Sequence, residues 1–479
     1  MDKDSSSFFQ TEEFHQTLAK YEEMQDGGKA VYLDGDQLSD IAEYYASNDQ
    51  YGKALEAMDY ALRLHPDDAD LMAMKGSLLL ETGETEEARK IASQITASTY
   101  NTLYLKAGIL LKDNHPKQAE RLLKTMVYNE PDVDEDCFLD AAYLYMDNGY
   151  PHEAIQWFEK ALRTNPWNAT TQQDYAECCY RSNELERAIQ WYDKALDENP
   201  YSTECWFGLA KAYSLKEDYA EAFNALDFVL AIDSAHQPAI LLKAHVCFEL
   251  KNYEAASGLY LKYAEKNPEE SYPLYMAGEC FFCLNQTNEA LRHFQKAMKQ
   301  SPDPDPFTID IFQDIAFCYA KHGQSKKALE IIEKVIQADD EGNPDPYILK
   351  GETYLMGRQP AEAEKAFRMA LEKDHFQNPE TYSRIAFAYV DNLYIDEAIS
   401  VFKLLEGKFP DYGSSAVCMS YLYLLKRDDR SFEKYLKKAI EKDPRTVKQF
   451  MDEHLSGLPK IQQIYKEYLS LYEAQNAHS

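Results

Sequence analysis

Two stretches of this 479-residue chain are nearly identical: AIQWFEKALRTNPW, from Ala154 to Trp167, and AIQWYDKALDENPY, from Ala188 to Tyr201. They agree at nine of fourteen positions and begin 34 residues apart. Self-similarity at a fixed period of this size is the sequence signature of a repeat architecture, in which every repeat is one supersecondary element. The two stretches therefore predict that the chain is a tandem array of similar repeats.

The alanine that opens each stretch recurs along most of the chain, at intervals of 31 to 38 residues. Its positions are Ala54, Ala88, Ala119, Ala154, Ala188, Ala222, Ala256, Ala290, Ala328, Ala363 and Ala398. Phe432 takes its place in one further repeat. The array therefore holds about twelve repeats.

Every repeat has the same internal layout. A small residue lies twelve positions before the central alanine, as at Ala142 and Gly351. In the third repeat we take Gly108, eleven positions before Ala119, as the equivalent, which makes its turn one residue shorter. Apolar residues at i, i+3, i+4 and i+7 predict two amphipathic helices per repeat, and the small residue lets their axes approach closely. Each repeat is therefore predicted to be a helical hairpin.

These positions resemble the tetratricopeptide repeat. One repeat carries that family's spacing in Trp206, Leu209, Ala210, Tyr213, Ala222 and Leu226, and another carries it in Tyr347, Gly351, Tyr354, Ala363, Phe367 and Ala370. The resemblance covers roughly residues 35–446. It implies an all-α fold, a right-handed α-solenoid superhelix of helical hairpins whose concave groove is lined mainly by the first helix of each repeat.

The flanks and junctions of the array predict its domain organisation. We expect a polar tail and a capping helix in residues 1–34, about twelve repeats in 35–446, and capping helices in 447–479, because a solenoid must cover its end faces. For the last helix, a detachable element for a partner or a homodimer is the alternative. Proline-rich junctions near 301–308 and 339–346 are either hinges or longer surface loops.

Charge and cysteine usage bound the partners and the compartment. The formal net charge of −32 disfavours nucleic acid and anionic membrane surfaces and is compatible with a basic or apolar protein or peptide partner. No apolar run is long enough for a transmembrane helix, so we expect no membrane insertion. Nine irregularly placed cysteines suggest free, mostly buried thiols, and the cytoplasm is the expected location.

No catalytic constellation appears in the sequence. The Cys280 and Cys283 pair has the C-x-x-C form, but its mid-helix position favours core packing over redox chemistry. The eleven histidines form no i, i+4 ligand pair, and no nucleotide-binding glycine loop or nucleophile elbow is present. We therefore expect no enzyme activity, no metal site and no cofactor.

The candidate binding residues are those that the resemblance assigns to the groove: three before, one after and four after the small residue of each first helix. Ten of these positions are predicted to contact a partner: Tyr143, Tyr180, Phe207, Lys211, His245, Phe248, Tyr275, Glu279, Phe282 and Phe317. They form an aromatic track with few charges. The alternative is that neighbouring first helices bury these side chains. Some relatives hold a partner's carboxylate with Lys, Arg and Asn, and the matching positions here offer only Lys211.

The sequence therefore predicts a non-enzymatic scaffold or adaptor that binds a peptide or helix of a protein partner in the groove. The alternative is a self-assembling structural protein that forms homo-oligomers through its terminal helices.

Overall fold

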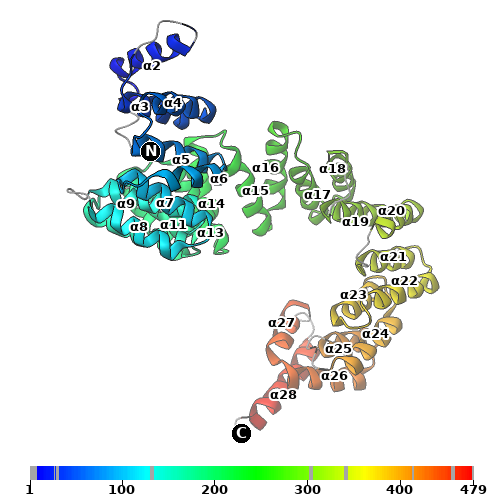
Figure 1. Ribbon diagram of the computed structural model, residues 1–479. Coiled ribbons are helices and arrows are strands. Elements are labelled where there is room, and N and C mark those ends of the chain that lie inside the picture. The colour runs from blue at the N-terminus through cyan, green and yellow to red at the C-terminus, as the bar shows by residue number, and fades with distance from the viewer. Residues whose placement is uncertain are drawn as a thin grey trace. The chain divides into compact units, whose positions relative to one another are not determined.

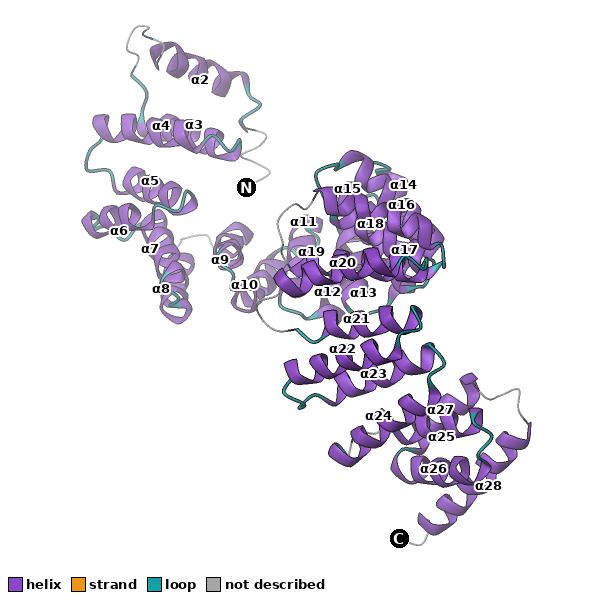
Figure 2. Ribbon diagram, turned by 90° about the vertical axis from the view of Figure 1, so that its right-hand side faces the viewer, coloured by secondary structure: helices purple, strands orange, loops and turns teal. Residues whose placement is uncertain are grey.

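The structure is a computed structural model, and it describes residues 8–25, 27, 32–129, 134–300, 306–338, 343–410, 412, 415–454 and 459–476. In these ranges every regular element is an α-helix (Figures 1 and 2). Contacts divide the chain into an N-terminal half, Met1–Val246, and a C-terminal half, Cys247–Ser479. The predicted all-α class is confirmed.

Twelve helical hairpins follow one another, with one helix before them and two after. The helices up to the division are α2 (Glu12–Gln25), α3 (Gly35–Ser47), α4 (Tyr51–Leu64), α5 (Ala69–Glu81), α6 (Thr85–Gln94), α7 (Tyr100–Lys112), α8 (Pro116–Asn129), α9 (Glu135–Asp147), α10 (Pro151–Thr164), α11 (Ala169–Arg181), α12 (Leu185–Glu198), α13 (Thr203–Leu215), α14 (Tyr219–Ile232) and α15 (Gln237–Glu249), which spans it. The helices that follow are α16 (Tyr253–Lys266), α17 (Tyr272–Cys283), α18 (Thr287–Gln300), α19 (Pro306–Lys321), α20 (Ser325–Ala338), α21 (Asp345–Met356), α22 (Pro360–Lys373), α23 (Pro379–Asp391), α24 (Ile395–Lys408), α25 (Ser415–Leu425), α26 (Asp429–Lys442), α27 (Pro444–His454) and α28 (Pro459–Asn476). The hairpins α3–α4 to α25–α26 are the twelve predicted repeats.

One residue in each hairpin turn adopts the left-handed conformation. It always lies five positions before the central alanine or Phe432, and the twelve residues are Asp49, Gly83, Asn114, Gly149, Asn183, Glu217, Lys251, Asn285, Gly323, Arg358, Leu393 and Arg427. At Gly149 the backbone N–H donates to Met146 O at 3.1 Å, and the next N–H donates to Tyr145 O at 2.9 Å. These bonds satisfy the last carbonyls of the first helix and end it. The repeat period is thus fixed by turn geometry as well as by packing.

The small residues do what their position predicts. A Cβ added to Gly351 would lie 2.2 Å from the ring of Phe367, and one added to Gly278 would lie 2.5 Å from the ring of Phe294. The first helix therefore lies directly against an aromatic side chain of the second helix of the same hairpin. The central alanines are all fully buried. Larger side chains at these sites would force the two helices apart.

The third repeat corrects one sequence assignment. Helix α7 ends at Lys112 and α8 begins at Pro116, so its turn has the same length as the turn between α9 and α10. The true small residue is Ala107, which is fully buried twelve positions before Ala119. Gly108 lies one position later, on the surface that the first helices share. Two small residues stand side by side there, and the sequence alone did not tell them apart.

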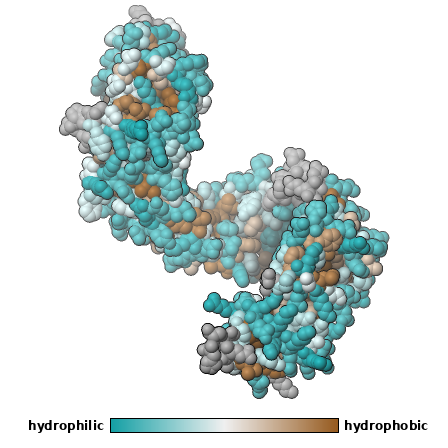
Figure 3. Space-filling view, turned by 60° about the horizontal axis from the view of Figure 1, so that its bottom comes forward, coloured by the Kyte–Doolittle hydropathy of each residue, from teal (hydrophilic) through white to brown (hydrophobic). Residues whose placement is uncertain are grey.

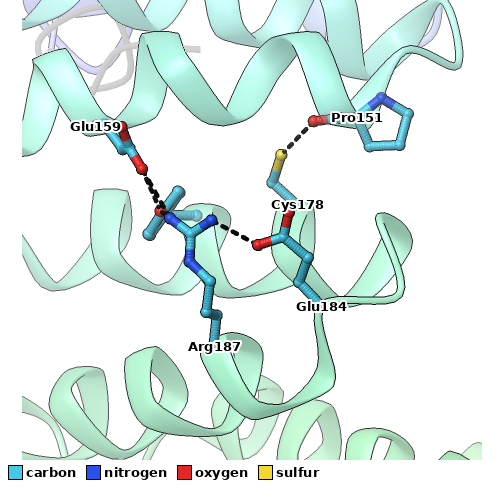
Figure 4. A network of polar contacts seen from close by, with 6 residues as sticks. Pro151, Glu159, Cys178, Glu184 and Arg187 are labelled. Carbon is cyan, nitrogen blue, oxygen red and sulfur yellow. Dashed lines mark hydrogen bonds and ion pairs between the residues drawn. The ribbon is translucent and has the colours of Figure 1, made fainter.

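Polar contacts also join neighbouring hairpins. On α12, Arg187 bonds to Glu184 at 2.5 Å and to Glu159 of the preceding hairpin at 2.7 Å (Figure 4). It also contacts the hydroxyl of Tyr175. The thiol of Cys178 donates to Pro151 O at 3.1 Å. This network lies between α10, α11 and α12 and fixes the stacking of two repeats.

At the C-terminal end, side chains of α27 and α28 pack in one cluster with the last hairpin. Tyr465 on α28 and Val447 and Met451 on α27 are buried in one cluster with Phe432 and Leu436 of α26. Capping by these helices stays a prediction, as do the capping role of α2 and the other domain bounds. The polar tail 1–7 and most of the two proline-rich junctions, 301–305 and 339–342, lie outside the described residues. None of the described helices is long and apolar enough to cross a bilayer.

Candidate functional site

In both halves, first helices of successive repeats contact one another, as α5 contacts α7 and α19 contacts α21. We call the surface that they share the first-helix face. All ten predicted binding residues are half-buried, so neither complete burial between helices nor full exposure describes them. Five of the ten belong to the N-terminal half and five to the C-terminal half. Their role in binding stays a prediction.

In the N-terminal half, one cluster joins α11 and α13. The ammonium of Lys211 lies 4.7 Å from the ring centroid of Tyr180 and 5.7 Å from that of Phe207. It also forms an ion pair with Glu177 at 3.0 Å, and Glu177 accepts a further bond from Tyr192 at 2.8 Å. Burial opposes ionisation of Glu177, but these hydrogen bonds and the ion pair lower its pKa below the usual range.

This ion pair bears on what the face can bind. Lys211 is the one lysine or arginine among the predicted binding residues, and it already forms an ion pair with Glu177. A carboxylate ligand would have to displace Glu177, a partly buried partner. The arrangement therefore does not favour recognition of a partner's carboxylate at this point.

Tyrosine–aspartate hydrogen bonds connect successive first helices. The hydroxyl of Tyr143 donates to Asp174 Oδ2 at 2.6 Å, which ties α9 to α11. In the same way Tyr100 donates to Asp140 Oδ2 at 2.7 Å and ties α7 to α9. Burial raises the pKa of Asp174, although the bond from Tyr143 partly offsets this effect. The hydroxyl of Tyr143 therefore already holds two first helices together.

In the C-terminal half, Tyr275 and Glu279 on α17 both hydrogen bond with Asp314 on α19. Burial raises the pKa of Glu279 and that of Asp314, and the nearby carboxylates of the cluster, including Asp310, add to the rise. Because both groups are partly desolvated, the pair shares a proton more readily than an isolated carboxyl would. Phe282 and Phe317 meet edge to face at 5.5 Å on the same two helices.

The remaining predicted residues are less connected to the others. Phe248 packs against the ring of Tyr253 at 5.4 Å, within the C-terminal half. His245 precedes the division and is half-buried on α15. The structure therefore brings together Tyr180, Phe207 and Lys211 in one half, and it joins Tyr275 with Glu279 and Phe282 with Phe317 in the other.

Sequence reasoning missed several carboxylates of this face. Asp140, Asp174 and Asp314 all lie two positions before the small residue of their repeat, and this recurrence was the available signal. Glu352, one position after Gly351, occupies a predicted groove position that was passed over. Burial raises its pKa to about 7.

The cysteines are free and mostly buried as predicted, but Cys283 is exposed at the last residue of α17, so the predicted core packing holds for Cys280 alone. All nine are free, and six are buried. Burial raises the pKa of Cys280 to about 12, and burial also raises that of Cys283, which is the reverse of what a redox pair requires. The described residues bring together no set of three or more His, Cys, Asp or Glu side chains suited to a metal ion.

Exposed apolar side chains are scattered over the rest of the surface. Trp167 and Tyr201, each directly after a proline that follows a second helix, are 76% and 79% exposed. The face shown in Figure 3 is mainly hydrophilic, with hydrophobic patches between the polar side chains. Trp167 and Tyr201 lie outside the helices, in the turns before α11 and α13, and supply control positions for experiments on the first-helix face.

Comparison with known proteins gives two family-model matches. The tetratricopeptide repeat model matches residues 45–107 and 215–275, and the model of subunit 3 of the anaphase-promoting complex, or cyclosome, matches residues 147–229. A DnaJ homolog subfamily C member 7 homolog of Dictyostelium discoideum is 24% identical over 250 residues, covering 50% of this chain and 41% of that protein. DnaJ homolog subfamily C member 3 of Gallus gallus is 20% identical over 343 residues, covering 71% of this chain and 60% of that protein.

Similar solved structures include two proteins described as tetratricopeptide repeat proteins. A tetratricopeptide repeat protein from Parabacteroides merdae is 19% identical, with a TM-score of 0.39, over 53% of this chain and 98% of that one. The protein YrrB, described as having an unusual peptide-binding site, is 27% identical, with a TM-score of 0.34, over 38% of this chain and 91% of that one. The chain spans less than two thirds of both DnaJ relatives.

Proposed function

Because this chain belongs to the tetratricopeptide-repeat family, we propose that it is a non-enzymatic scaffold or adaptor that binds a peptide or helix of a protein partner. Repeat proteins of this kind present extended concave surfaces to their partners. The first-helix face is the proposed binding surface. The chain's nine free thiols suit a reducing compartment such as the cytoplasm, which is the proposed location.

One observation carries the proposal: successive first helices present half-buried aromatic side chains at one or another of the three positions that the resemblance assigns to the groove. Tyr180 and Phe207 do so in the N-terminal half, and Phe282 and Phe317 do so in the C-terminal half. Aromatic anchors in partly desolvated surroundings are the usual source of binding energy in protein interfaces. The hairpin framework around them recurs in every repeat, whereas these positions vary from repeat to repeat, as specificity requires.

The test compares partner recovery by the full chain and by the triple variant Phe207→Ala/Phe248→Ala/Phe282→Ala. We expect loss of the proteins that co-purify with the wild type. The control Trp167→Ala/Tyr201→Ala/Met369→Ala removes apolar side chains that are 76%, 79% and 43% exposed, and it should retain them. Unchanged recovery by a triple variant with native helical content would refute the proposal.

Since truncation to Ala lowers stability at half-buried sites, a second variant keeps the test decisive. Lys211→Met removes the cation beside Tyr180 and Phe207 while preserving the length of the side chain. A selective change in recovered partners with this variant supports the face, and no change with either variant refutes it.

Self-assembly is the second candidate, and one feature of α28 favours it. Leu471 is 58% exposed on this helix, whose other apolar side chains face α26 and α27. Deletion of the helix would itself expose Phe432 and Leu436, so Leu471→Ser is the cleaner test. Light scattering should show a smaller particle for the variant if this helix mediates association. A monomer in both proteins removes this candidate.

A further inference from the structure

Two adjoining recesses open on the first-helix face of the N-terminal half. One, of about 450 Å³, lies between α5, α7 and α9. The other, of about 610 Å³, lies between α3, α5 and α7. Ser77 and Tyr104 line both recesses. Volumes in this range are those of sites that hold ligands.

The sequence explains why the face is hollow here. Ser77 and Gly108 occupy the position one after the small residues Gly76 and Ala107. Later repeats carry Tyr143 and Phe317 at the same position. A Cβ on Gly108 would already lie 3.1 Å from Leu80 and 3.6 Å from Leu144. The first recess therefore lies where Ser77 and Gly108 carry no ring, although Leu80 and Leu144 fill the space next to Gly108.

The first recess is lined by charged groups, and Arg181 and Lys112 already attract one of them, Asp147. Glu81, Lys112 and Asp147 end α5, α7 and α9, and none of the three has a hydrogen bond or ion pair with another described residue. Burial raises the pKa of both carboxyls, and their mutual repulsion adds to the rise at Glu81. The C-terminal ends of three helices also carry partial negative charge. A cation would relieve this repulsion.

The second recess is more acidic. Asp36, Asp40, Glu43, Asp68 and Asp70 all line it, and no lysine or arginine does. Burial raises the pKa of Asp40, and Asp36 adds to the rise. Asp70 accepts hydrogen bonds from Thr99 at 2.7 Å and Asn101 at 3.2 Å, which hold it in place on the wall. A cation in this recess would therefore meet several carboxylates.

Tyr104 lines both recesses and adds a neutral polar group to the acids. Its hydroxyl has no hydrogen-bond partner among the described residues. Burial, with Asp140, Asp147 and Glu81, raises its pKa well above the usual range, so the phenol stays neutral. A neutral phenol accepts a hydrogen bond from a cationic donor through its oxygen, and its ring attracts a cation through its face.

We propose that the two recesses bind two basic side chains, lysine or arginine, from one segment of a partner protein. The inference rests on the proposed function, in that it takes the first-helix face as the surface that meets a protein, and it specifies the chemistry of that partner. Seven carboxylates against one lysine line the two recesses together, which matches the chain's acidic net charge of −32. None of the ten predicted binding residues lines either recess.

The experiment measures binding of a peptide of alternating glycine and lysine to the full chain by calorimetry at low ionic strength, where screening is weak. The same peptide with acetylated lysines removes the charge. We expect saturable binding of the first peptide and none of the second. Absence of binding, or equal binding of both peptides, would overturn the proposal.

Two variants locate the site. Glu81→Gln/Asp147→Asn removes two charges, and Ser77→Phe fills both recesses without changing any charge. Each should weaken peptide binding at least about tenfold, because charge-assisted hydrogen bonds are lost or blocked. The control Asp197→Asn/Glu198→Gln makes the same change in charge at exposed positions of α12 and should change the Kd less than about twofold. Equal loss in the control would show that only net charge matters, and wild-type affinity in both site variants would place binding elsewhere.

A further experiment tests whether the recesses bind free amines or the lysine side chains of a protein. Butane-1,4-diamine carries the same ammonium chemistry without a peptide, and we expect it to compete only weakly. Competition as strong as that of the peptide would assign the recesses to free amines and overturn the claim of a protein partner. A negative result in the peptide experiment can be distinguished from failure of the proposed function. The partner-recovery test substitutes aromatic residues that line neither recess.

Discussion

At the scale of single residues, the repeat is set by a few backbone and packing requirements. One residue per hairpin turn must adopt the left-handed conformation, and only three of the twelve are glycine. For an L-residue with a side chain this conformation costs about 1–2 kcal/mol. The turns at Leu393, Arg358 and Lys251 are therefore locally strained. The packing of the stacked helices offsets the free-energy cost of that strain.

Leu393 gives the clearest test of this strain. Its φ is +67°, and its side chain is 83% exposed, so replacement by glycine removes strain and loses no buried contact. We expect Leu393→Gly to stabilise the C-terminal half by about 0.5–1 kcal/mol in urea unfolding. Leu404→Gly, at a 62% exposed helical position, should destabilise it by about 1 kcal/mol. A loss of stability at both sites would contradict the account of the turn.

Glu352 predicts a pH dependence of stability. Burial raises its pKa to about 7, Asp391 adds to the rise, and Arg384 opposes it. A glutamate in the unfolded chain ionises near pH 4.3, so stability is lost as the pH rises from about 4 through 7.

The variant Glu352→Gln lacks this loss. It should match the wild type at pH 4 and be more stable by about 1–3 kcal/mol at pH 8. Chemical unfolding at both pH values measures the difference, and the exposed Glu364→Gln serves as control. A constant offset between wild type and Glu352→Gln at both pH values would contradict the prediction.

At the residue scale, the sequence predicted correctly those positions where every hairpin needs the same kind of residue. The central alanines and Gly351 were predictable because every hairpin needs a small residue at those points. Gly108 was misassigned because it stands next to Ala107, and packing alone decides which of the two faces the second helix. Asp174 and Glu352 were missed because their importance depends on burial and on a partner from a neighbouring first helix. Such contacts join residues about one repeat apart and leave no local pattern.

At the scale of elements, each helix depends on its neighbours for burial, and the ends of the array are the exception. Helix α28 buries Tyr465 against the last hairpin, and the hydroxyl of Tyr468 donates to Glu433 at 2.9 Å. The apolar spacing of this helix was visible in the sequence, but which side chains it would cover was not. Its amphipathic stripe fits a cap, a partner site and a dimer contact equally well until its packing is known.

If α28 is a cap, weakening its contact will loosen α26. We expect Tyr465→Ala to cost about 3 kcal/mol, because a buried aromatic side chain is lost. Hydrogen exchange in α26 should then become faster. Leu471→Ala, on the exposed side of α28, should change exchange in α26 little. Equal protection of α26 in the wild type and in Tyr465→Ala would show that the helix does not act as a cap.

At the scale of the whole molecule, the chain combines a recurring framework with a variable first-helix face. The fold was predictable from the sequence because the period, the small residues and the turn positions all agree, and such agreement across levels is what specifies a structure. The chemistry of the face was less predictable. Its aromatic positions could be assigned from their spacing to the small residue of each first helix. The two acidic recesses could not, because they depend on how the small side chain of Ser77 packs among residues of neighbouring first helices.

The central claim is that partners bind the first-helix face, and site-specific photo-crosslinking tests it most directly. A photoreactive phenylalanine analogue at Tyr180 or at Phe282 lies on that face, and the same analogue at Tyr201 or Leu404 lies on exposed surface elsewhere. We predict that a co-purifying partner is captured from the first pair of positions and not from the second. Capture from Tyr201 or Leu404, with none from Tyr180 or Phe282, would contradict the account.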